Sequence, residues 1–584
     1  MPDFGKYNAL LKDQWQRTDS IPASILDGKV VQGKDAKALL EAVLRPGDRV
    51  VIEGNNQKQA RFLAQVMAQL DPAKVHGLHM LQSSVTLDEH LDIFRRGIAR
   101  DLDFAFSGPQ AVGLAKLVAE GKVRIGAIHT YPELYSRYFT DLPPKVALIT
   151  AEHADAEGNL YTGYNTEETP LIVEATHARK GIVIAQVEKV VERVRRIDIP
   201  GDQVEFIVVT GQKTQIDPLF TRDPAKLTAD QIFMAMLAIK GIYAEYGVQV
   251  VNHGIGYAAC AIELLLPTYA EKLGLKGKIC RHWVLNPHPT LIPAIEAGWV
   301  KSIHCFGSEP GMEDYIAARS DIFYTCHDGI LKSNRAISHM AGYYGLDMFI
   351  GATLQMDADG NSSTATLGRI SGFGGAPNLG SNATGRRHAS PAWSKAGQEM
   401  AASGQLAGCM PRGRKLVVQI TPTVVAKKNI PIFVDELDAV RMAREGMFAD
   451  PPIMIYAEDV THIVTEKGIA YLTRCASRLE RQAAIRAIAG DTPVGRRASK
   501  AETDFLRAKR AVMLPEDLGI RLSDATTDLL AAHSIKDLQR ISGFLYHPPA
   551  EFLEPPAAET PKPAARPAGE GQMVPDAKHS RPER

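Results

Sequence analysis

Long hydrophobic runs are missing from this 584-residue sequence. Apolar stretches such as Ala258–Leu266 are far too short to cross a bilayer, which argues against a membrane-spanning protein. The amino-terminal residues Met1–Tyr7 also lack the basic-then-apolar order of a signal peptide. We therefore expect a cytoplasmic protein with no membrane partner.

Cysteine and charge patterns exclude further classes of protein. The six cysteines form no CxxC pair and no metal-ligand spacing, so neither a disulfide framework nor a zinc site is expected. His282, His288 and His327 are not at zinc-helix spacing either. Lysine plus arginine and aspartate plus glutamate number 67 each, so no overall field attracts nucleic acid.

Three common catalytic motifs do not occur in their expected context: the GxSxG elbow, the P-loop and the GxGxxG dinucleotide fingerprint. What is present is an alternation of short apolar runs with helical patterns, which predicts an open, mainly parallel α/β sheet. The first half shows strand patterns at residues 48–53, 75–81, 102–107, 123–128 and 146–150, with helical patterns that include 34–43 and 60–70.

The pattern then restarts, with a strand over Val248–His253, a turn at Gly254–Gly256 and a helix after it. Turns of the form DAxGN occur at Asp155–Asn159 and Asp357–Asn361, about 200 residues apart, and the two strand-turn-helix patterns are separated by about the same distance. Short turns also match by chance. We expect two tandem, structurally similar open α/β domains and a disordered tail rich in proline and alanine. Their predicted bounds are 1–225, 226–547 and 548–584.

A glycine-dense stretch, Gly368–His388, lies within about thirty residues that the second domain has and the first lacks. Glycines there allow positive φ and close approach of the backbone to a ligand. Short polar side chains and the adjacent Arg386 and Arg387 favour a phosphate or carboxylate ligand, although a polar surface loop is the alternative. The residues concerned are Ser371, Gly372, Gly374, Gly375, Asn378, Arg386 and Arg387.

Two turns at the carboxyl ends of predicted strands could border the same cleft. One carries Asn55, Asn56 and Gln57, and the other runs from Gly254 to Tyr257. Backbone N–H groups of Gly254–Gly256, just before a helix, could hold an anion or a developing oxyanion. A plain tight turn is the alternative.

Five segments in this order resemble the acetyl-CoA hydrolase and CoA-transferase superfamily, and up to about Leu545 the chain resembles the alpha subunits of malonate decarboxylase. The segments are His253–Tyr257, Ile295–Gly298, Asp357–Asn361, Ser371–Gly375 and Val464–Ala470. The resemblance implies CoA-transferase-like domains and an acyl-carrier-protein transferase. Such an enzyme moves the carrier thiol from an acetyl to a malonyl group and releases acetate.

The resemblance also implies the partners. The carrier protein would bear a phosphoribosyl-dephospho-CoA arm, and other subunits would decarboxylate the malonyl thioester. Malonate and acetate would be the small molecules, and no cofactor would be bound covalently to this chain.

One departure from the superfamily concerns the mechanism. Many CoA transferases have a nucleophilic glutamate roughly ten residues before the segment that matches Ile295–Gly298, where this chain has Leu285–Pro287. We therefore expect direct transfer without a glutamyl thioester. Gly254, Gly256 and Asn286 are the expected catalytic residues. Asn55, Asn56, Gln57 and Tyr257 are expected to bind substrate together with the residues of the glycine-dense stretch, and Arg335 and Lys332 are further candidate cations.

Two alternatives stay open at this point. One is a CoA transferase acting on free CoA thioesters, or the related alpha subunit of citrate lyase. The other is a non-catalytic scaffold that binds an acyl carrier partner.

Overall fold

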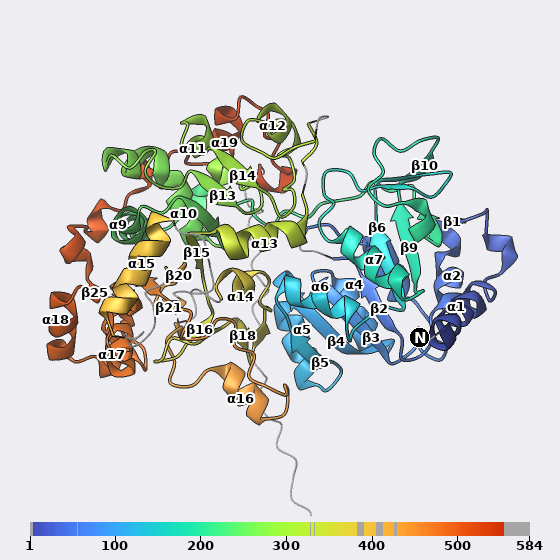
Figure 1. The fold of residues 1–584 in the computed structure, drawn as a ribbon, viewed down its shortest axis with the longest axis horizontal. Helices are drawn as coiled ribbons and strands as arrows, with labels where there is room; N and C mark the ends of the chain where they lie inside the picture. The colour runs from blue at the N-terminus through green and yellow to red at the C-terminus, as the bar shows by residue number, and fades with distance from the viewer. Residues whose placement is uncertain are drawn as a thin grey trace, which may run out of the picture.

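The computed structural model describes residues 4–54, 57–326, 329–331, 333–381, 390–404, 413–425 and 429–553. In that part of the chain two eight-stranded sheets lie beside each other, each covered by helices (Figure 1). The chain forms the first sheet before residue 210 and the second after residue 249. The predicted pair of tandem open α/β units is therefore confirmed.

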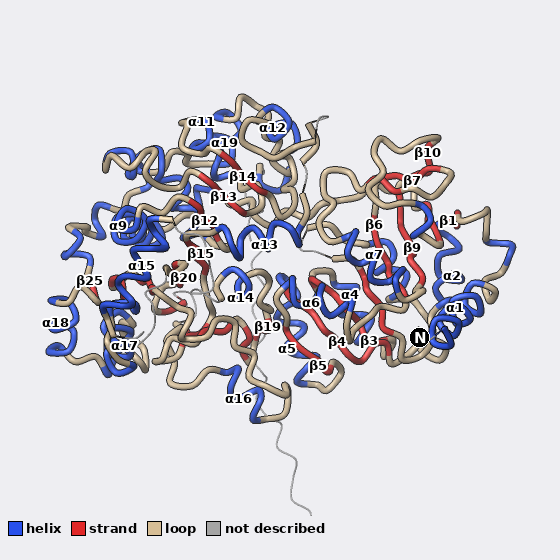
Figure 2. Tube along the Cα trace, viewed as in Figure 1, coloured by secondary structure: helices blue, strands red, loops and turns tan. Residues whose placement is uncertain are grey.

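Every neighbouring pair in the first sheet is parallel. Parallel neighbours need crossover connections, and helices supply most of them (Figure 2). The strand order is β1 (Val30–Gln32), β11 (Phe206–Val209), β9 (Ile182–Val187), β6 (Val146–Thr150), β2 (Arg49–Ile52), β3 (Leu78–Ser84), β4 (Ala99–Phe106), β5 (Arg124–Ile128). The helices are α1 (Phe4–Thr18), α2 (Ala36–Val43), α3 (Arg61–Met67), α4 (Asp88–Arg95), α5 (Ala111–Ala119), α6 (Tyr131–Phe139) and α7 (Thr169–Ala178). A small sheet joins β10 (Lys189–Val191), β7 (His153–Asp155) and β8 (Leu160–Tyr161).

Alternate residues of these strands enter different cores. On β2, Val50 and Ile52 join the core under α2 to α5, whereas Val51 joins the core under α6 and α7. A strand that is buried on both faces needs a nearly continuous apolar run, and this is why β2 and β6 read as such runs in the sequence.

The second sheet is parallel from its first strand to β23 and antiparallel beyond it. Its order is β14 (Ser302–His304), β13 (His282–Val284), β12 (Val250–His253), β15 (Met348–Gly351), β20 (Leu416–Ile420), β23 (His462–Thr465), β24 (Gly468–Tyr471), β25 (Val512–Met513). The helices are α8 (Ala229–Ala238), α9 (Ala244–Tyr246), α10 (Tyr257–Leu265), α11 (Ile292–Glu296), α12 (Glu313–Ala318), α13 (Arg335–Gly345), α14 (Ala376–Leu379), α15 (Pro391–Ala402), α16 (Asp438–Arg444), α17 (Arg478–Ile488), α18 (Lys500–Ala508) and α19 (Ile535–Ile541). Short strand pairs are β16 (Gln355–Met356) with β17 (Ser362–Ser363), β18 (Ala365–Thr366) with β19 (Arg369–Ile370), and β21 (Val424–Val425) with β22 (Ile430–Pro431).

The two sheets repeat one arrangement. The order β4-β3-β2-β6-β9-β11 in the first corresponds to β14-β13-β12-β15-β20-β23 in the second. Both DAxGN turns have the same geometry, because the Asn159 N–H donates to Asp155 Oδ1 and the Asn361 N–H to Asp357 Oδ1, each at 2.9 Å. The repeat predicted from these turns is thus present in the structure.

The glycine-dense segment is an addition to the second half that reaches across to the first. After β19 the chain runs along the end of β4, where the N–H groups of Phe373 and Gly374 donate to the Ala105 carbonyl at 2.7 and 2.8 Å. In Figure 1, α14 and β18 lie beside α5 and α6 of the first half. The segment therefore joins the two halves as well as bordering the space between them.

Gly372 makes this approach possible. Its φ is +73°, and a Cβ at this position would lie 2.4 Å from the Ala105 carbonyl oxygen. A side chain would therefore clash with β4, so the glycine is required here by backbone conformation and by space together.

The boundary predicted between residues 225 and 226 lies between the sheets, just before α8. The Thr228 hydroxyl accepts the Gln231 N–H, while the Gln231 side chain accepts the Thr228 N–H, so a capping box starts this helix.

The carboxyl-terminal end stays folded beyond the predicted start of the tail at Pro548. Phe552 and Leu553 pack against the core of the second half. The rest of the predicted tail lies outside the described residues. Within the described ranges, no helix is both long and apolar enough to cross a membrane.

Candidate active site at the junction of the two halves

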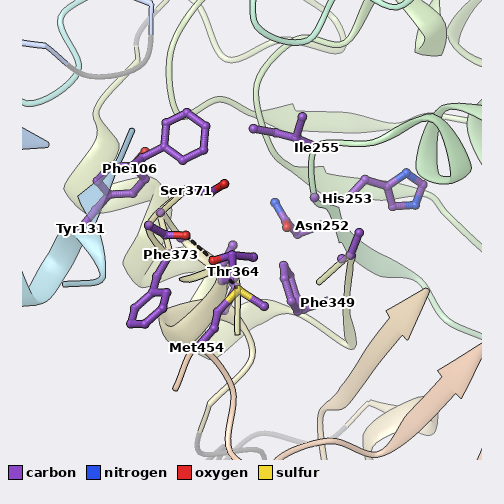
Figure 3. Close-up of a pocket in the computed structure, with 18 of the residues that line it drawn as sticks. Phe106, Tyr131, Asn252, His253, Ile255, Phe349, Thr364, Ser371, Phe373 and Met454 are labelled. Atoms are coloured by element: carbon purple, nitrogen blue, oxygen red, sulfur yellow. Dashed lines mark hydrogen bonds between the residues drawn. The ribbon is translucent and has the colours of Figure 1, made fainter. Parts of the chain in front are cut away.

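A cavity of about 310 Å³ lies where the second sheet meets the first half. The carboxyl ends of β12, β13 and β15 border it, and Phe106 and Tyr131 close it from the first half (Figure 3). Open parallel sheets bind ligands beyond the carboxyl ends of their strands, and this volume is in the range of small-molecule sites. The cavity is therefore the candidate active site.

The walls are mostly apolar, with polar groups in a few places. The described residues that line it include no aspartate, glutamate, lysine or cysteine. Polar side-chain atoms come from amides, hydroxyls, two histidines and two arginines. The apolar and aromatic lining residues include Phe106, Tyr131, Phe220, Phe306, Phe349 and Met454. The polar ones include Asn252, Asn286, Thr353, Thr364, Ser371, Arg335 and Arg369.

The glycine turn after β12 borders the cavity with Gly254 and Ile255. The Gly254 N–H donates to the Ile350 carbonyl at 2.8 Å, so it continues the sheet and is not directed at the cavity. Gly256 is the N-cap of α10 and borders a separate small space with Glu263 and neighbouring residues. An oxyanion at this turn would thus have to use N–H groups other than that of Gly254.

His253 turns its ring away from the cavity (Figure 3). Its Nδ1 lies 2.9 Å from Glu263 Oε1 and its Nε2 lies 2.8 Å from the Tyr243 hydroxyl. Glu263 Oε1 also accepts from His288 Nδ1 at 2.8 Å, and its Oε2 accepts from Thr290. Burial alone would raise the pKa of Glu263, but the two histidines hold it below its ordinary value.

A chain of amides runs behind the cavity wall. Asn286, which follows β13, donates from Nδ2 to Gln57 Oε1 at 2.6 Å, and Gln57 donates from Nε2 to Glu309 Oε2 at 2.5 Å. Glu309 Oε1 accepts the Phe220 N–H at 3.0 Å and the Thr221 N–H at 2.7 Å. Burial raises the pKa of Glu309 to about 7, and the hydrogen bonds from residues 219–221 oppose that rise.

Arg335 connects the two halves at the cavity wall. Its Nε lies 3.1 Å from Glu167 Oε2, and its guanidinium covers the Tyr131 ring at 4.7 Å. Burial raises the pKa of Glu167 to about 7 although Arg335 opposes that rise. The charge of Arg335 is therefore largely matched by a carboxylate of the first half.

His339 is a neutral, apolar part of the wall. Its ring stacks on Phe306 with centroids 4.5 Å apart and meets Tyr131 edge-on at 5.3 Å. Burial and the nearby Arg335 hold the pKa of His339 well below its ordinary value. Asn378 donates to the His339 carbonyl at 3.1 Å, so this amide positions α13.

Arg369 supplies a second cation to the cavity. Its Nε donates to Ser371 Oγ at 2.9 Å, and the residue is exposed. No described carboxylate forms an ion pair with it, in contrast to Arg335. Arg369 is therefore available to an anionic ligand.

Comparison with known proteins decides the family. The family described as malonate decarboxylase, alpha subunit, transporter, matches residues 6–554. The chain belongs to the malonate decarboxylase alpha subunit family. It is 55% identical over 547 residues to the acetyl-S-ACP:malonate ACP transferase of Malonomonas rubra, covering 94% of this chain and 99% of that protein.

Solved structures agree with this family. The chain superposes on the crystal structure of a Pseudomonas malonate decarboxylase hetero-tetramer in complex with malonate with a TM-score of 0.89 and 53% identity, covering 94% of this chain and 99% of that chain. The putative alpha subunit of citrate lyase from Streptococcus mutans is 17% identical with a TM-score of 0.55, covering 80% and 83%, and this likeness shows the fold alone. An acyl-CoA transferase from E. coli O157:H7 is 14% identical with a TM-score of 0.50, covering 76% of this chain and 87% of that chain, so the chain has a CoA-transferase-like α/β fold.

The structure brings many of the residues predicted from the family resemblance to one place. Asn286 and the glycine-dense segment line the cavity, while Gln57 lies one hydrogen bond behind Asn286. Tyr257 packs against the second core and under the Arg222 guanidinium instead of lining the cavity. The predicted residues that line the cavity are Gly254, Asn286, Ser371, Gly372, Gly374 and Gly375. Asn55, Asn56, Lys332, Arg386 and Arg387 lie outside the described residues.

Sequence reasoning missed several residues that line the cavity or lie behind its wall. Phe106 and Tyr131 come from the first half and carry no local signal of a site. Glu309 and His339 are separated from their partners by long stretches of chain, so spacing could not pair them. Arg369 lies within the glycine-dense stretch itself, so composition could have revealed it.

Proposed function

We propose that this chain is the acyl-carrier-protein transferase of a malonate decarboxylase. It would convert acetyl-S-carrier protein and malonate into malonyl-S-carrier protein and acetate. Family membership and the 55% identity to a transferase of that name support the proposal. The carrier would bring its thiol on a phosphoribosyl-dephospho-CoA arm, and decarboxylase subunits would be further partners in a multisubunit complex.

The observation that supports direct transfer is the composition of the cavity wall. No carboxylate or thiol side chain is among the described residues that line the cavity. The nearby carboxylates Glu263 and Glu309 each accept several hydrogen bonds and are fully buried. A nucleophile on the protein would have to leave such partners to reach a thioester, so malonate itself is the better nucleophile.

The reaction then has two steps. A malonate carboxylate oxygen attacks the acetyl thioester carbon, the C–S bond breaks, and the carrier leaves as thiolate from an acetyl–malonyl anhydride. The thiolate next attacks the malonyl carbonyl carbon, the bridging C–O bond breaks, and acetate leaves with that oxygen. No proton is gained or lost overall.

Positioning must supply much of the rate, because a carboxylate is a weak nucleophile. Well-oriented reactants can gain about 7–11 kcal/mol of barrier reduction, and exclusion of water by aromatic walls protects the anhydride. Arg369 is suited to hold a malonate carboxylate, and Asn286 to contact the reacting groups. Gly374 and Gly375 leave room for the arm beside the wall.

A single-turnover experiment tests the mechanism. Enzyme in excess over acetylated carrier receives malonate labelled with ¹⁸O, and the acetate is analysed by mass spectrometry. Direct transfer gives acetate with one ¹⁸O in the first turnover. A glutamyl route gives unlabelled acetate first, because that oxygen comes from the protein, and hydroxylamine would then trap an enzyme-bound acyl group.

Substrate exchange separates the alternatives. Free acetyl-CoA in place of acetylated carrier tests a simple CoA transferase, and citrate in place of malonate tests the citrate lyase reaction. Absence of any exchange, together with retained carrier binding, would identify a scaffold. A cytoplasmic location stays a prediction from the sequence.

A further inference from the structure

Glu309 is placed to control the orientation of Asn286, although it does not line the cavity. It follows β14 in the second half and is fully buried. Its Oε1 accepts the N–H groups of Phe220 and Thr221 and the Thr221 hydroxyl at 2.8 Å. Its Oε2 accepts the short hydrogen bond from Gln57 of the first half and a longer one, at 3.4 Å, from the Leu219 N–H. Ionised Glu309 can only accept hydrogen bonds, so Gln57 must turn its NH₂ toward it.

This constraint passes along the two amides. Because Gln57 donates its NH₂ to Glu309, its Oε1 faces Asn286, and Asn286 must donate its own NH₂ to that oxygen. Asn286 Nδ2 also donates to the Ser308 carbonyl at 3.3 Å. Among the described residues all hydrogen bonds of Asn286 come from Nδ2, so Oδ1 is the atom left for a ligand in the cavity.

A lone-pair acceptor at that position opposes the proposed substrate, because a malonate carboxylate and a tetrahedral oxyanion both seek donors. A proton on Glu309 Oε2 reverses the direction of every hydrogen bond in this series of amides. The Glu309 hydroxyl donates to Gln57 Oε1, Gln57 donates to Asn286 Oδ1, and Asn286 turns its NH₂ to the cavity. The reversal gives up only the long contact with Ser308, whereas a carboxylate ligand gains a charge-assisted hydrogen bond.

We propose that Glu309 is a positioning residue that acts through Gln57, so that malonate binding is coupled to uptake of one proton and turns the Asn286 NH₂ toward the substrate. This inference rests on the proposed function, because it names malonate as the ligand. It adds a proton that the transfer chemistry itself does not require.

The charged surroundings of Glu309 fit a titration near neutrality. Its pKa is raised to about 7 by burial. Lys58, next to Gln57, forms an ion pair with Glu53, its Nζ lying 3.1 Å from Glu53 Oε1. Arg222, in the segment between the two sheets, donates to the Leu219 and Thr221 carbonyls at 2.7 and 2.9 Å.

One further titratable neighbour stays neutral. Burial raises the pKa of the Tyr546 hydroxyl, and the charges of Glu309 and Glu313 add to that rise. Glu309 itself is therefore the group expected to change charge around pH 7.

Glu309→Gln is the decisive variant. Its Oε1 must accept the N–H groups of residues 219–221, so its NH₂ faces Gln57 and imitates the protonated acid permanently. Glu205→Gln is the matched control. Glu205 is a partly buried carboxyl of the first half that accepts the Val183 N–H, and its pKa is likewise raised to about 7 by burial.

Wild type and Glu205→Gln should lose kcat/KM for malonate about tenfold per pH unit above pH 7, whereas Glu309→Gln should show no such loss up to pH 8.5. Calorimetry of malonate binding at pH 8 in buffers of different ionisation enthalpy should give close to one proton taken up by wild type and close to none by Glu309→Gln.

Two results would overturn the inference. One is malonate binding by wild-type protein at pH 8 without proton uptake, a measurement that needs no folded variant. The other is an identical pH profile for wild type and Glu309→Gln. Failure of wild type to bind malonate at all would instead sink the proposed function and this inference together.

Discussion

Arg335 of the second half lies against Glu167 of the first, with Nε and Oε2 3.1 Å apart and both side chains almost fully buried. A buried ion pair is costly to break from one side, because the remaining charge has lost its partner and its water. The pair is therefore a fixed link between the halves at the edge of the cavity.

Arg335→Met should destabilise the protein by about 3–5 kcal/mol, because Glu167 would stay buried without its cation. Denaturant unfolding at pH 8, where Glu167 is mostly ionised, measures the effect. Arg441→Ala is the control, since it removes an exposed pair with Glu445 that solvent screens, and it should leave the free energy of unfolding almost unchanged. Equal effects of the two substitutions would contradict a buried link.

Gly372→Ala should weaken the contact between the glycine-dense segment and β4. The new Cβ would lie 2.4 Å from the Ala105 carbonyl at a φ of +73°, a strain of about 1–3 kcal/mol. Gly368→Ala is the matched control, because nothing lies within 4 Å of a Cβ there. We expect reduced turnover and a lower Tm for the first variant and wild-type values for the second.

Arg369→Ala should raise the KM for malonate. A hydrogen bond to a charged group contributes about 1.5–3 kcal/mol, which corresponds to roughly a 10- to 100-fold loss of kcat/KM. The KM for acetylated carrier should change little, and Arg496→Ala, at an exposed surface ion pair with Asp491, should change neither. A carrier KM that rises as much as the malonate KM would place Arg369 on the carrier arm instead.

The protein should lose stability in acid because of the buried carboxylate of Glu263. Its pKa is held below the ordinary value in the folded protein, so its contribution is present above about pH 4.5 and is lost as the pH falls through the lower folded value. Wild type should therefore lose stability steadily below pH 4.5. Glu263→Gln should be less stable at pH 7 and should lose less on acidification. Unfolding by urea from pH 3 to pH 7 compares them, and parallel curves would rule out this role.

Local patterns in the sequence predicted most of the fold. The strand at Val146–Thr150 was found at its true bounds, because burial on both faces makes such a strand continuously apolar. The DAxGN turns identified the repeat, because Asp, Gly and Asn each have a local role in that turn.

The candidate site was predicted only in part. Asn286 and the residues Ser371–Gly375 were found through the family resemblance and the glycine content, and they line the cavity. Tyr257 was expected there for the same reason, but it is half-buried against the second core and under the Arg222 guanidinium. The assigned roles of these residues stay predictions.

Taken by itself, the sequence determined the two α/β units, their repeat and the family, because these depend on short-range periodicity and on the order of motifs. The tertiary structure decided how residues distant along the chain meet. Gln57 and Glu309 are 252 positions apart, and Arg335 and Glu167 are 168 apart. Such pairs leave no spacing signal, since it is the docking of one folded half on the other that brings buried charges and amides into contact.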